Sequence, residues 1–283
     1  MQSWTIGKVR ITKVVEMEVA GGTRFILPDA TREACEPFEW MKPDFMTDEG
    51  RLIMSIHALV IETPTKKIVV DTCIGNDKQR ANPNWTNLQK PFLDDMAKAG
   101  HPVDSIDVVL CTHLHVDHVG WNTMLVDGKW VPTFKNARYL LAQPEFEYWR
   151  DQDTDAESRH IFADSVQPVF EAGLVDFVTT THRICDEVSL KPTHGHTPGH
   201  CSVMIESEGQ TAMITGDLVH HPCQMARMDW CSTADYDQAA AQATRERVFD
   251  EFAESPTLII GTHFAGRTAG HLKRDGKAYW LKV

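Results

Sequence analysis

The stretch His113-Leu114-His115-Val116-Asp117-His118 places four potential metal ligands within six positions. It follows the apolar run Val108-Val109-Leu110-Cys111, which predicts a buried strand that ends in a polar loop. His113 and His115 are two positions apart, so in an extended chain their imidazoles point the same way and can hold one ion. The last two residues of the stretch come after a turn and can reach a second ion.

Isolated and clustered histidines lead to different interpretations. A single His in an apolar context is more often a packing or surface residue than a ligand. Three His and one Asp in so short a stretch are instead typical of a metal or catalytic site. Four ligands do not complete two ions, so further ligands must come from later in the chain.

Three later segments qualify as sources of further ligands. They are His194–His200, Ile214–Asp217 and Ile259–His263. The last two repeat the pattern of the first motif, an apolar strand followed by Gly and a polar side chain, and Gly lets the backbone approach closely. We therefore expect segments that are far apart in the sequence to meet at one site.

The loop and the later segments together resemble the metallo-β-lactamase superfamily, whose hallmark is a His-x-His-x-Asp-His loop. The likeness covers nearly the whole chain, because the later His, Asp and His occur in the family's order. Within the superfamily the chain looks most like methyl parathion hydrolase and the N-acyl-homoserine lactonases, on the run Gly195–His200 and the late Ala269–His271. The resemblance implies an α/β fold, a four-layer αβ/βα sandwich with the metals at one edge of the stacked sheets.

The resemblance also implies a ligand set for two divalent cations. The implied ligands of one metal are His113, His115 and His196, those of the other are Asp117, His118 and His263, and Asp217 bridges both together with a water or hydroxide. Zn²⁺ is the expected metal for such ligands, with Mn, Fe and Co as alternatives. Asp117 and Asp217 are the expected catalytic carboxylates, and Asp217 would also relay a proton to the leaving group.

Five further residues are candidates for supporting or pocket-lining roles: Asp71, His200, His220, His221 and His271. The family analogy implies that Asp71 orients a metal-bound His, whereas the alternative is an Asp that caps a turn. His200 is expected to hydrogen-bond or pack rather than to bind metal. His220 and His221 either line the substrate pocket or lie on the surface, and His271 matches a Gly-His that the family has near its site.

Length and ligand spacing bear on the domain organisation. At 283 residues the chain can bury a large core, and length alone allows two domains. The expected ligands run from His113 to His263, however, so we expect one hydrolase domain over residues 1–283. Within it, the irregular and aromatic-rich stretch 21–51 is expected to form either a lid or pocket wall over the metals or an interface with the body or a second subunit.

Hydrophobic patterning predicts that strands and helices alternate along the chain. The expected strands lie within 9–19, 56–61, 68–70, 108–111, 139–142, 188–190, 203–205, 212–215, 258–260 and 279–281, and the expected helices lie within 88–98, from 144 onward and within 235–252. Ser232 and Thr233 would cap the last of these helices. The acidic stretch 151–159 fits a surface loop or a helix end.

The composition limits the classes of binding partner and the cellular compartment that we expect for this protein. The net charge of -12 argues against a nucleic-acid partner, because phosphate backbones require a basic surface. The seven Cys are scattered and form no CxxC pair, which favours a reducing cytoplasm. No apolar run is long enough to span a membrane, and the N-terminus lacks the pattern of a secretory signal. We expect a cytoplasmic protein that acts on a small molecule, and the family likeness leaves a homodimer open.

The expected function is dinuclear metal-dependent hydrolysis of a lactone or carboxylic ester, in which a metal-bridging hydroxide attacks the carbonyl carbon. A phosphotriesterase is the alternative, because the same hydroxide can attack phosphorus. A β-lactamase fits less well because no export signal is evident, and a non-catalytic metal-binding sensor fits less well because the ligand set is intact. A di-iron redox protein of this fold usually carries a flavin module, for which the chain has no spare length.

Overall fold

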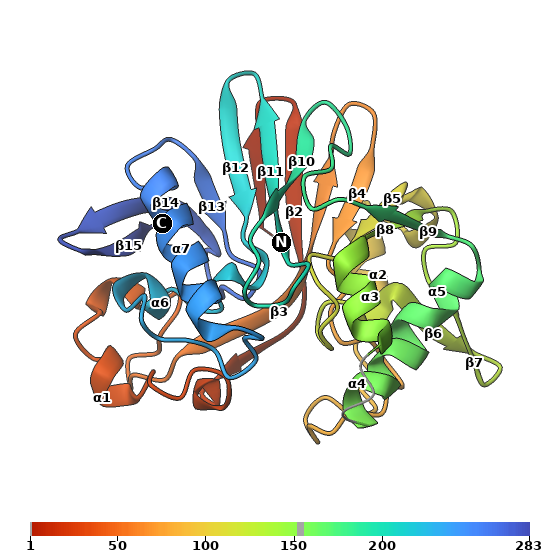
Figure 1. Ribbon diagram of the computed structural model, residues 1–283, viewed down its shortest axis with the longest axis horizontal. Coiled ribbons are helices and arrows are strands. Elements are labelled where there is room, and N and C mark those ends of the chain that lie inside the picture. Colours follow the sequence, from red (N-terminus) through yellow and green to blue (C-terminus); the bar gives the residue numbers. More distant parts are fainter. Residues whose placement is uncertain (1, 152–155) are drawn as a thin grey trace.

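The core of the protein is a pair of stacked β-sheets (Figure 1). The computed structural model describes residues 2–151 and 156–283. The seven-stranded sheet has the order β1 (Ser3–Ile6), β2 (Val9–Ala20), β3 (Ile53–Glu62), β4 (Lys67–Val70), β5 (Val108–Leu110), β8 (Arg138–Ala142), β9 (Val175–Val178). The six-stranded sheet has the order β10 (Val188–Pro192), β11 (Cys201–Ser207), β12 (Gln210–Ile214), β13 (Leu258–Ile260), β14 (Ala269–Asp275), β15 (Ala278–Lys282), and β6 (Thr123–Val126) pairs with β7 (Lys129–Pro132).

Helices cover the outer faces of the two sheets (Figure 1). Those beside the seven-stranded sheet are α2 (Phe92–Lys98), α3 (Gln143–Asp151), α4 (Ala156–Ile161) and α5 (Gln167–Glu171), and those beside the six-stranded sheet are α1 (Arg32–Cys35), α6 (Cys223–Ala226) and α7 (Gln238–Phe252). The order of layers is therefore helix, sheet, sheet, helix. This is the four-layer αβ/βα sandwich expected from the sequence, and the predicted fold class is confirmed.

Strand β3 shows how the alternation of side chains builds the layers. Its Leu59 and Ile61 are buried between the two sheets, whereas Ala58 and Val60 are buried between the seven-stranded sheet and its helices. Successive side chains of a strand point to opposite faces, so the stretch 58–61, which is covered on both faces, is apolar at every position. Full burial of one such aliphatic side chain contributes about 1.5–3 kcal/mol.

Parallel pairing brings the ends of several strands to one edge of the molecule. In the seven-stranded sheet β4, β5 and β8 run parallel, and Val70 pairs with Leu110. In the six-stranded sheet β12 and β13 run parallel, and Ile214 pairs with Ile260. The carboxyl ends of these strands lie at the same edge, so the polar residues that come after each strand are carried there together.

Two expected helices begin later than predicted. Helix α2 begins at Phe92 rather than near residue 88. Helix α7 begins at Gln238, because the side chain of Asp237 accepts a hydrogen bond from the amide of Ala240 and acts as the N-cap in place of Ser232 or Thr233. In the acidic stretch 151–159, position 151 ends α3 and 156–159 belong to α4, while 152–155 lie outside the described residues.

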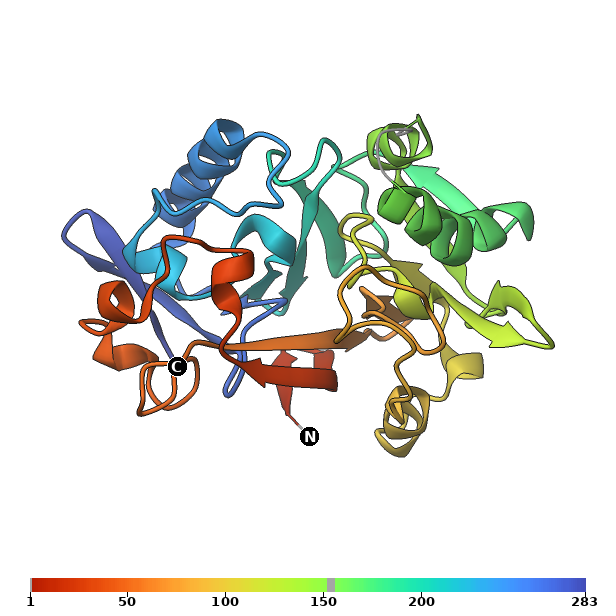
Figure 2. The same cartoon turned by 90° about the horizontal axis from the view of Figure 1, so that it is seen from below.

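The stretch 21–51 packs against the C-terminal half of the chain (Figure 2). Leu27, Met41 and Phe45 are fully buried in an apolar cluster that also contains Phe249 of α7. Phe25, in contrast, is 77% exposed. The buried side chains of the stretch are therefore part of the body of the protein, while its tip, at Phe25 and Ile26, lies beside a cavity. Within the described residues, no helix combines the length and apolarity that crossing a bilayer requires.

Gly120 provides a test of how tightly the loops at this edge are packed. A Cβ at Gly120 would overlap the carbonyl oxygen of Ile74, whereas a Cβ at Gly209 would meet open space. We expect Gly120→Ala to lower the free energy of unfolding by about 3 kcal/mol or more, because the two loops must move apart. Gly209→Ala, which forces Ala to adopt a positive φ, should cost about 1 kcal/mol. Urea unfolding of both variants measures the difference, and equal costs would contradict the packing described here.

Candidate metal centre

Five segments converge at the shared edge of the sheets. Asp71 follows β4, the stretch 113–118 follows β5, and the loop 193–200 connects β10 to β11. Asp217 lies in a short turn, Gly216–Leu218, directly after β12, and His263 follows β13. The strand-then-polar-residue pattern in the sequence therefore places each of these side chains at one rim.

The first cluster combines three imidazoles and one carboxylate. The Nε2 atom of His113 lies 3.0 Å from Nδ1 of His115 and 3.2 Å from Nε2 of His196, which is itself 2.9 Å from Nδ1 of His115. The Oδ2 atom of Asp217 lies 3.4 Å from Nε2 of His196 and 3.7 Å from Nε2 of His113. Four donor atoms thus surround one point.

These separations fit a tetrahedral cation. Donor atoms about 2.0–2.1 Å from a tetrahedral zinc ion lie about 3.3 Å from one another. The observed spacing of 2.9–3.7 Å brackets that value. Three imidazole nitrogens at such distances converge on one point, where a shared cation would accept a lone pair from each. The donor set of the first cluster therefore fits a divalent metal.

The second cluster uses the other oxygen of Asp217. Its Oδ1 atom lies 3.1 Å from Nε2 of His263 and 3.4 Å from Nε2 of His118. The Nε2 atoms of His118 and His263 are 3.3 Å apart, and the two carboxylate oxygens of Asp117 lie 3.7 and 3.6 Å from them. One buried carboxylate therefore has one oxygen directed at each cluster.

Groups that face Nδ1 orient three of the imidazoles, His196, His263 and His118. The Nδ1 atom of His196 donates to Oδ1 of Asp235 at 2.8 Å, and Nδ1 of His263 donates to the carbonyl of Ser55 at 3.1 Å. Nδ1 of His118 is 3.0 Å from Oδ2 of Asp71. A proton on Nδ1 directs Nε2 of His196 and of His263 toward the clusters, where a metal ligand would offer its lone pair.

Burial and the charge of Asp217 have opposite effects on the pKa of the imidazoles, and a different effect is the stronger in each cluster. Burial lowers the pKa of His113, His115 and His196 well below its ordinary value, so these rings are neutral at pH 7. Burial also acts to lower the pKa of His118 and His263, but the nearby Asp217 carboxylate raises the first well above its ordinary value and the second to about 8. The first cluster is thus already deprotonated for a cation.

The structure places the predicted supporting residues Asp71 and His200 beside the clusters. Besides facing His118, Asp71 accepts hydrogen bonds from the amide and hydroxyl of Thr112. His200 donates from Nδ1 to the carbonyl of Thr193 and accepts the amide of Asp217 at Nε2, at 2.8 Å. His200 therefore fixes the backbone of Asp217 through a hydrogen bond.

The structure places the other three candidates for supporting or pocket-lining roles, His220, His221 and His271, in three different surroundings. His220 is fully buried rather than on the surface, with Nε2 3.3 Å from Oδ2 of Asp217. His221 does not line the pocket, because its Nε2 donates to the carbonyl of Phe45 and its Nδ1 accepts the amide of Cys223. The placement of His271 near the site was wrong, because His271 pairs with Leu258 at the far end of β13 from His263.

Sequence reasoning missed two carboxylates at the site. Asp235 binds His196, and Glu145 is a buried acid at the start of α3. Glu145 comes shortly after the strand 138–142 and so repeats the pattern of the other site segments, which was a usable signal. Asp235 carries no such signal, because the loop that precedes α7 has no regular pattern.

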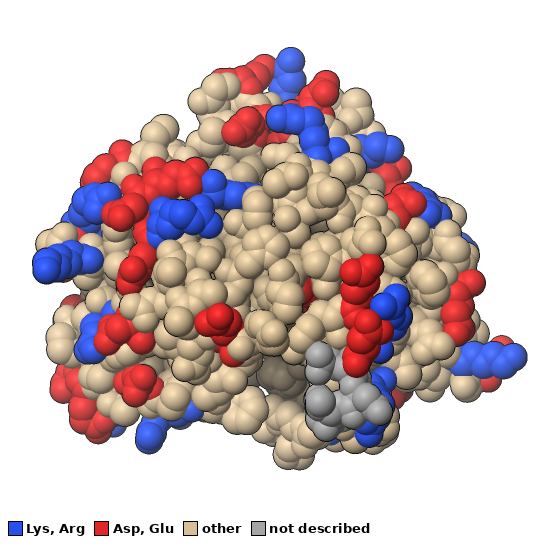
Figure 3. All heavy atoms as spheres, viewed as in Figure 1, with Lys and Arg blue, Asp and Glu red and all other residues tan. Residues whose placement is uncertain are grey.

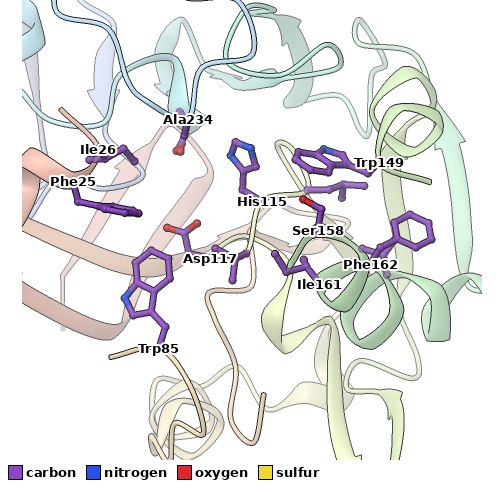
Figure 4. A pocket seen from close by; sticks show the side chains of 14 residues that line it. Phe25, Ile26, Trp85, His115, Asp117, Trp149, Ser158, Ile161, Phe162 and Ala234 are labelled. Atoms are coloured by element: carbon purple, nitrogen blue, oxygen red, sulfur yellow. The ribbon is translucent and has the colours of Figure 1, made fainter. Parts of the chain in front are cut away.

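A cavity of ≈ 170 Å³ opens beside the clusters (Figure 4). His115, Asp117 and Asp217 contribute to its lining. Its walls are mainly apolar: Phe25, Ile26 and Trp85 lie on one side, and Trp149, Ile161 and Phe162 lie on the other. Figure 3 shows the hollow on a face whose centre is largely free of charged side chains. The arrangement suits an uncharged, apolar group next to a polar centre.

The sequence profile of the metallo-beta-lactamase superfamily matches residues 53–263, a span that contains all members of both clusters. The chain belongs to this superfamily. The superfamily recognised from the sequence is thus confirmed, and the His and Asp clusters are consistent with the metal binding that its members share.

Three proteins illustrate what the chain is similar to. An N-acyl homoserine lactonase from Bacillus sp is 22% identical over 176 residues, which span 58% of this chain and 63%, less than two thirds, of that relative. The solved hydrolase AbOPH superposes with a TM-score of 0.81 at 22% identity and covers 99% of this chain and 96% of its own. AidC, described as a dizinc quorum-quenching lactonase, superposes with a TM-score of 0.79 at 18% identity, covering 100% and 97%. At these identities the two structures show a shared fold.

The contact between Asp71 and His118 generates a prediction for metal affinity. Asp71 has a positive φ of 57, which Asn tolerates, so Asp71→Asn should fold while losing the charge that faces Nδ1 of His118. Loss of such a partner typically costs 10–100-fold in metal affinity. Zinc titration against a competing chelator measures it, with the exposed Asp229→Asn as control. Unchanged zinc binding in Asp71→Asn would show that this contact does not support a metal ligand.

Proposed function

We propose that the chain is a dinuclear metal-dependent hydrolase of lactones or other carboxylic esters. The observation that carries the proposal is the position of Asp217, which faces both ligand clusters and also lines the apolar cavity. A substrate in that cavity would meet the point that the two clusters share. The names of the lactonase relatives support the same class of substrate.

The proposed ligands are assigned from the geometry of the clusters. We assign His113, His115 and His196 to one cation and Asp117, His118 and His263 to the other, with Asp217 shared. Imidazole and carboxylate donors suit Zn²⁺ and also accept Mn, Fe or Co. Because these residues come from both sheets, we also infer that residues 1–283 act as one domain.

When bound, two divalent cations would activate water at neutral pH and polarise the substrate oxygen. The protein's own residues orient the two carboxylates of the site, Asp217 and Asp117. His200 holds the amide of Asp217, so the carboxylate keeps one oxygen on each side. Asp117 lines the cavity and contacts both His118 and His263, which places a second carboxylate next to the substrate. From its shared position Asp217 can also carry a proton to the leaving oxygen.

The apolar walls of the cavity would bind the part of the substrate that does not react. Phe25, Trp85, Trp149 and Ile161 offer no charge to a substrate. An acyl chain or aryl group would bury its surface there and gain about 0.8 kcal/mol for each methylene. The walls therefore favour hydrophobic lactones and esters over charged compounds.

Substitution of the shared carboxylate tests the dinuclear assignment. Asp217→Asn keeps the shape of the side chain but replaces one oxygen by an NH₂ group that cannot bind a cation. We expect fewer than two metal ions per chain and a fall in kcat/KM of at least about 100-fold, or about 2.7 kcal/mol. Metal analysis and hydrolysis kinetics measure both, with Asp229→Asn as the control. Near-normal turnover by Asp217→Asn would contradict its proposed role.

A substrate panel tests the reaction class. Acyl lactones, aryl esters, organophosphates and cephalosporins are offered to the zinc-loaded protein. We expect lactones or esters to be hydrolysed, with kcat/KM rising about fourfold for each methylene added to the acyl chain until the cavity is full. Turnover of organophosphates alone would overturn the proposed substrate class in favour of a phosphotriesterase.

A further inference from the structure

Glu145 is a buried carboxylate that joins two separate loops. It lies in the first turn of α3 and is 1% exposed. Its Oε1 atom accepts hydrogen bonds from the amide of Leu114 at 3.0 Å and from Nε1 of Trp149 at 2.7 Å. Its Oε2 atom accepts the amide of Gly199 at 2.9 Å. Both oxygens are therefore occupied by donors from three different parts of the chain.

The two amides belong to the loops that supply the first cluster. Leu114 lies between His113 and His115, and Gly199 is three residues after His196. All three imidazoles of that cluster thus come from backbone that Glu145 holds. Asp117 and His118 follow further along the loop of Leu114, but the hydrogen bonds of the Glu145 side chain reach neither these residues nor His263.

Close packing gives an independent indication of the same link. A Cβ added to Gly199 would lie 2.5 Å from Cβ and from the backbone nitrogen of Glu145, so this loop rests directly on α3. One turn further along the helix, the ring of Trp149 packs edge-on to His115, with centroids 5.2 Å apart. Helix α3 therefore touches both loops of the first cluster, through hydrogen bonds and through van der Waals contact.

We propose that Glu145 is a positioning residue that sets the spacing of the three imidazole nitrogens of the first cluster. These nitrogens lie within 2.9–3.2 Å of one another, so a small shift of either loop would change the donor spacing that a cation meets. The Glu145 carboxylate anchors both loops through the amides of Leu114 and Gly199, so the cluster is preorganised for a metal. This inference rests on the proposed assignment of His113, His115 and His196 to one cation.

Selective loss of one metal ion is the expected signature. In Glu145→Gln, one oxygen becomes an NH₂ group that faces an N–H donor, so one anchor is lost. We expect zinc affinity at one of the two sites to fall about 10–100-fold while the other site keeps its affinity. The measurement is zinc titration against a competing chelator, together with metal content per chain. A residue needed only for folding would not weaken one site and spare the other.

Two further variants complete the experiment. Glu147→Gln, on the exposed side of the same helix, should bind both ions as the unaltered protein does. Trp149→Phe keeps an aromatic ring beside His115 and removes one donor to Glu145, so it should weaken the same site by a smaller factor. If Glu145→Gln does not fold, the zinc affinity of Trp149→Phe tests whether Glu145 positions the first cluster.

The outcomes separate this inference from the proposed function. If the unaltered protein binds two zinc ions and both Glu145→Gln and Trp149→Phe bind them with unchanged affinity, Glu145 does not position the cluster. An equal loss at both sites would also overturn the inference, because the effect would then not belong to the first cluster. If the unaltered protein binds fewer than two ions, the dinuclear assignment itself fails.

Discussion

The structure depends on one buried carboxylate surrounded by imidazoles. Five histidine nitrogens lie 3.1–3.7 Å from the oxygens of Asp217, which is 3% exposed. A buried carboxylate is costly unless positive charge or hydrogen-bond donors compensate it. Although burial alone would raise the pKa of Asp217, His263 and His118 hold it well below its ordinary value. The anionic charge at the centre of the site is therefore maintained by the residues around it.

A second set of residues keeps those imidazoles in place. Asp71, Asp235 and the carbonyl of Ser55 each face an Nδ1 atom and so direct Nε2 toward Asp217. Glu145 lies one step further out and accepts hydrogen bonds from the amides of Leu114 and Gly199, in the loops that carry the imidazoles of the first cluster. Such supports matter because loops alone do not hold several donors within 3–4 Å of one another. The rigid sheet edges and the buried acids together provide the necessary precision.

The cavity beside the two clusters is formed largely by segments other than those that carry the imidazoles. The cavity takes its walls from the tip of the stretch 21–51, from the loop around Trp85, and from helices α3 and α4. These segments meet residues of the two clusters, because His115, Asp117 and Asp217 also line the cavity. Phe25 and Trp85 come from segments outside the clusters, so changes there can alter substrate preference without altering the cluster residues.

Local patterning was enough to predict most of the fold and the identity of the clustered residues. Apolar runs that end in Gly, His or Asp indicated both the strands and the polar rim, because a strand that stops at a sheet edge leaves its next few residues at the surface of that edge. Helix starts were less predictable: Asp237 caps α7, while Ser232 and Asp235 are used by the loop before it. The aromatic stretch 21–51 could not be assigned either, since its residues have no period that tells a lid from a core.

The sequence by itself therefore determined the family, the layered fold and the candidate donors, because these depend on short-range spacing and strand periodicity. Only the tertiary structure decided that Asp217 turns one oxygen to each cluster, that His221 binds the carbonyl of Phe45, and that His271 lies at the far end of β13. It also decided the parts played by Glu145 and Asp235. The physical reason is that a contact between residues tens of positions apart is set by strand pairing and packing, which leave no local trace in the chain.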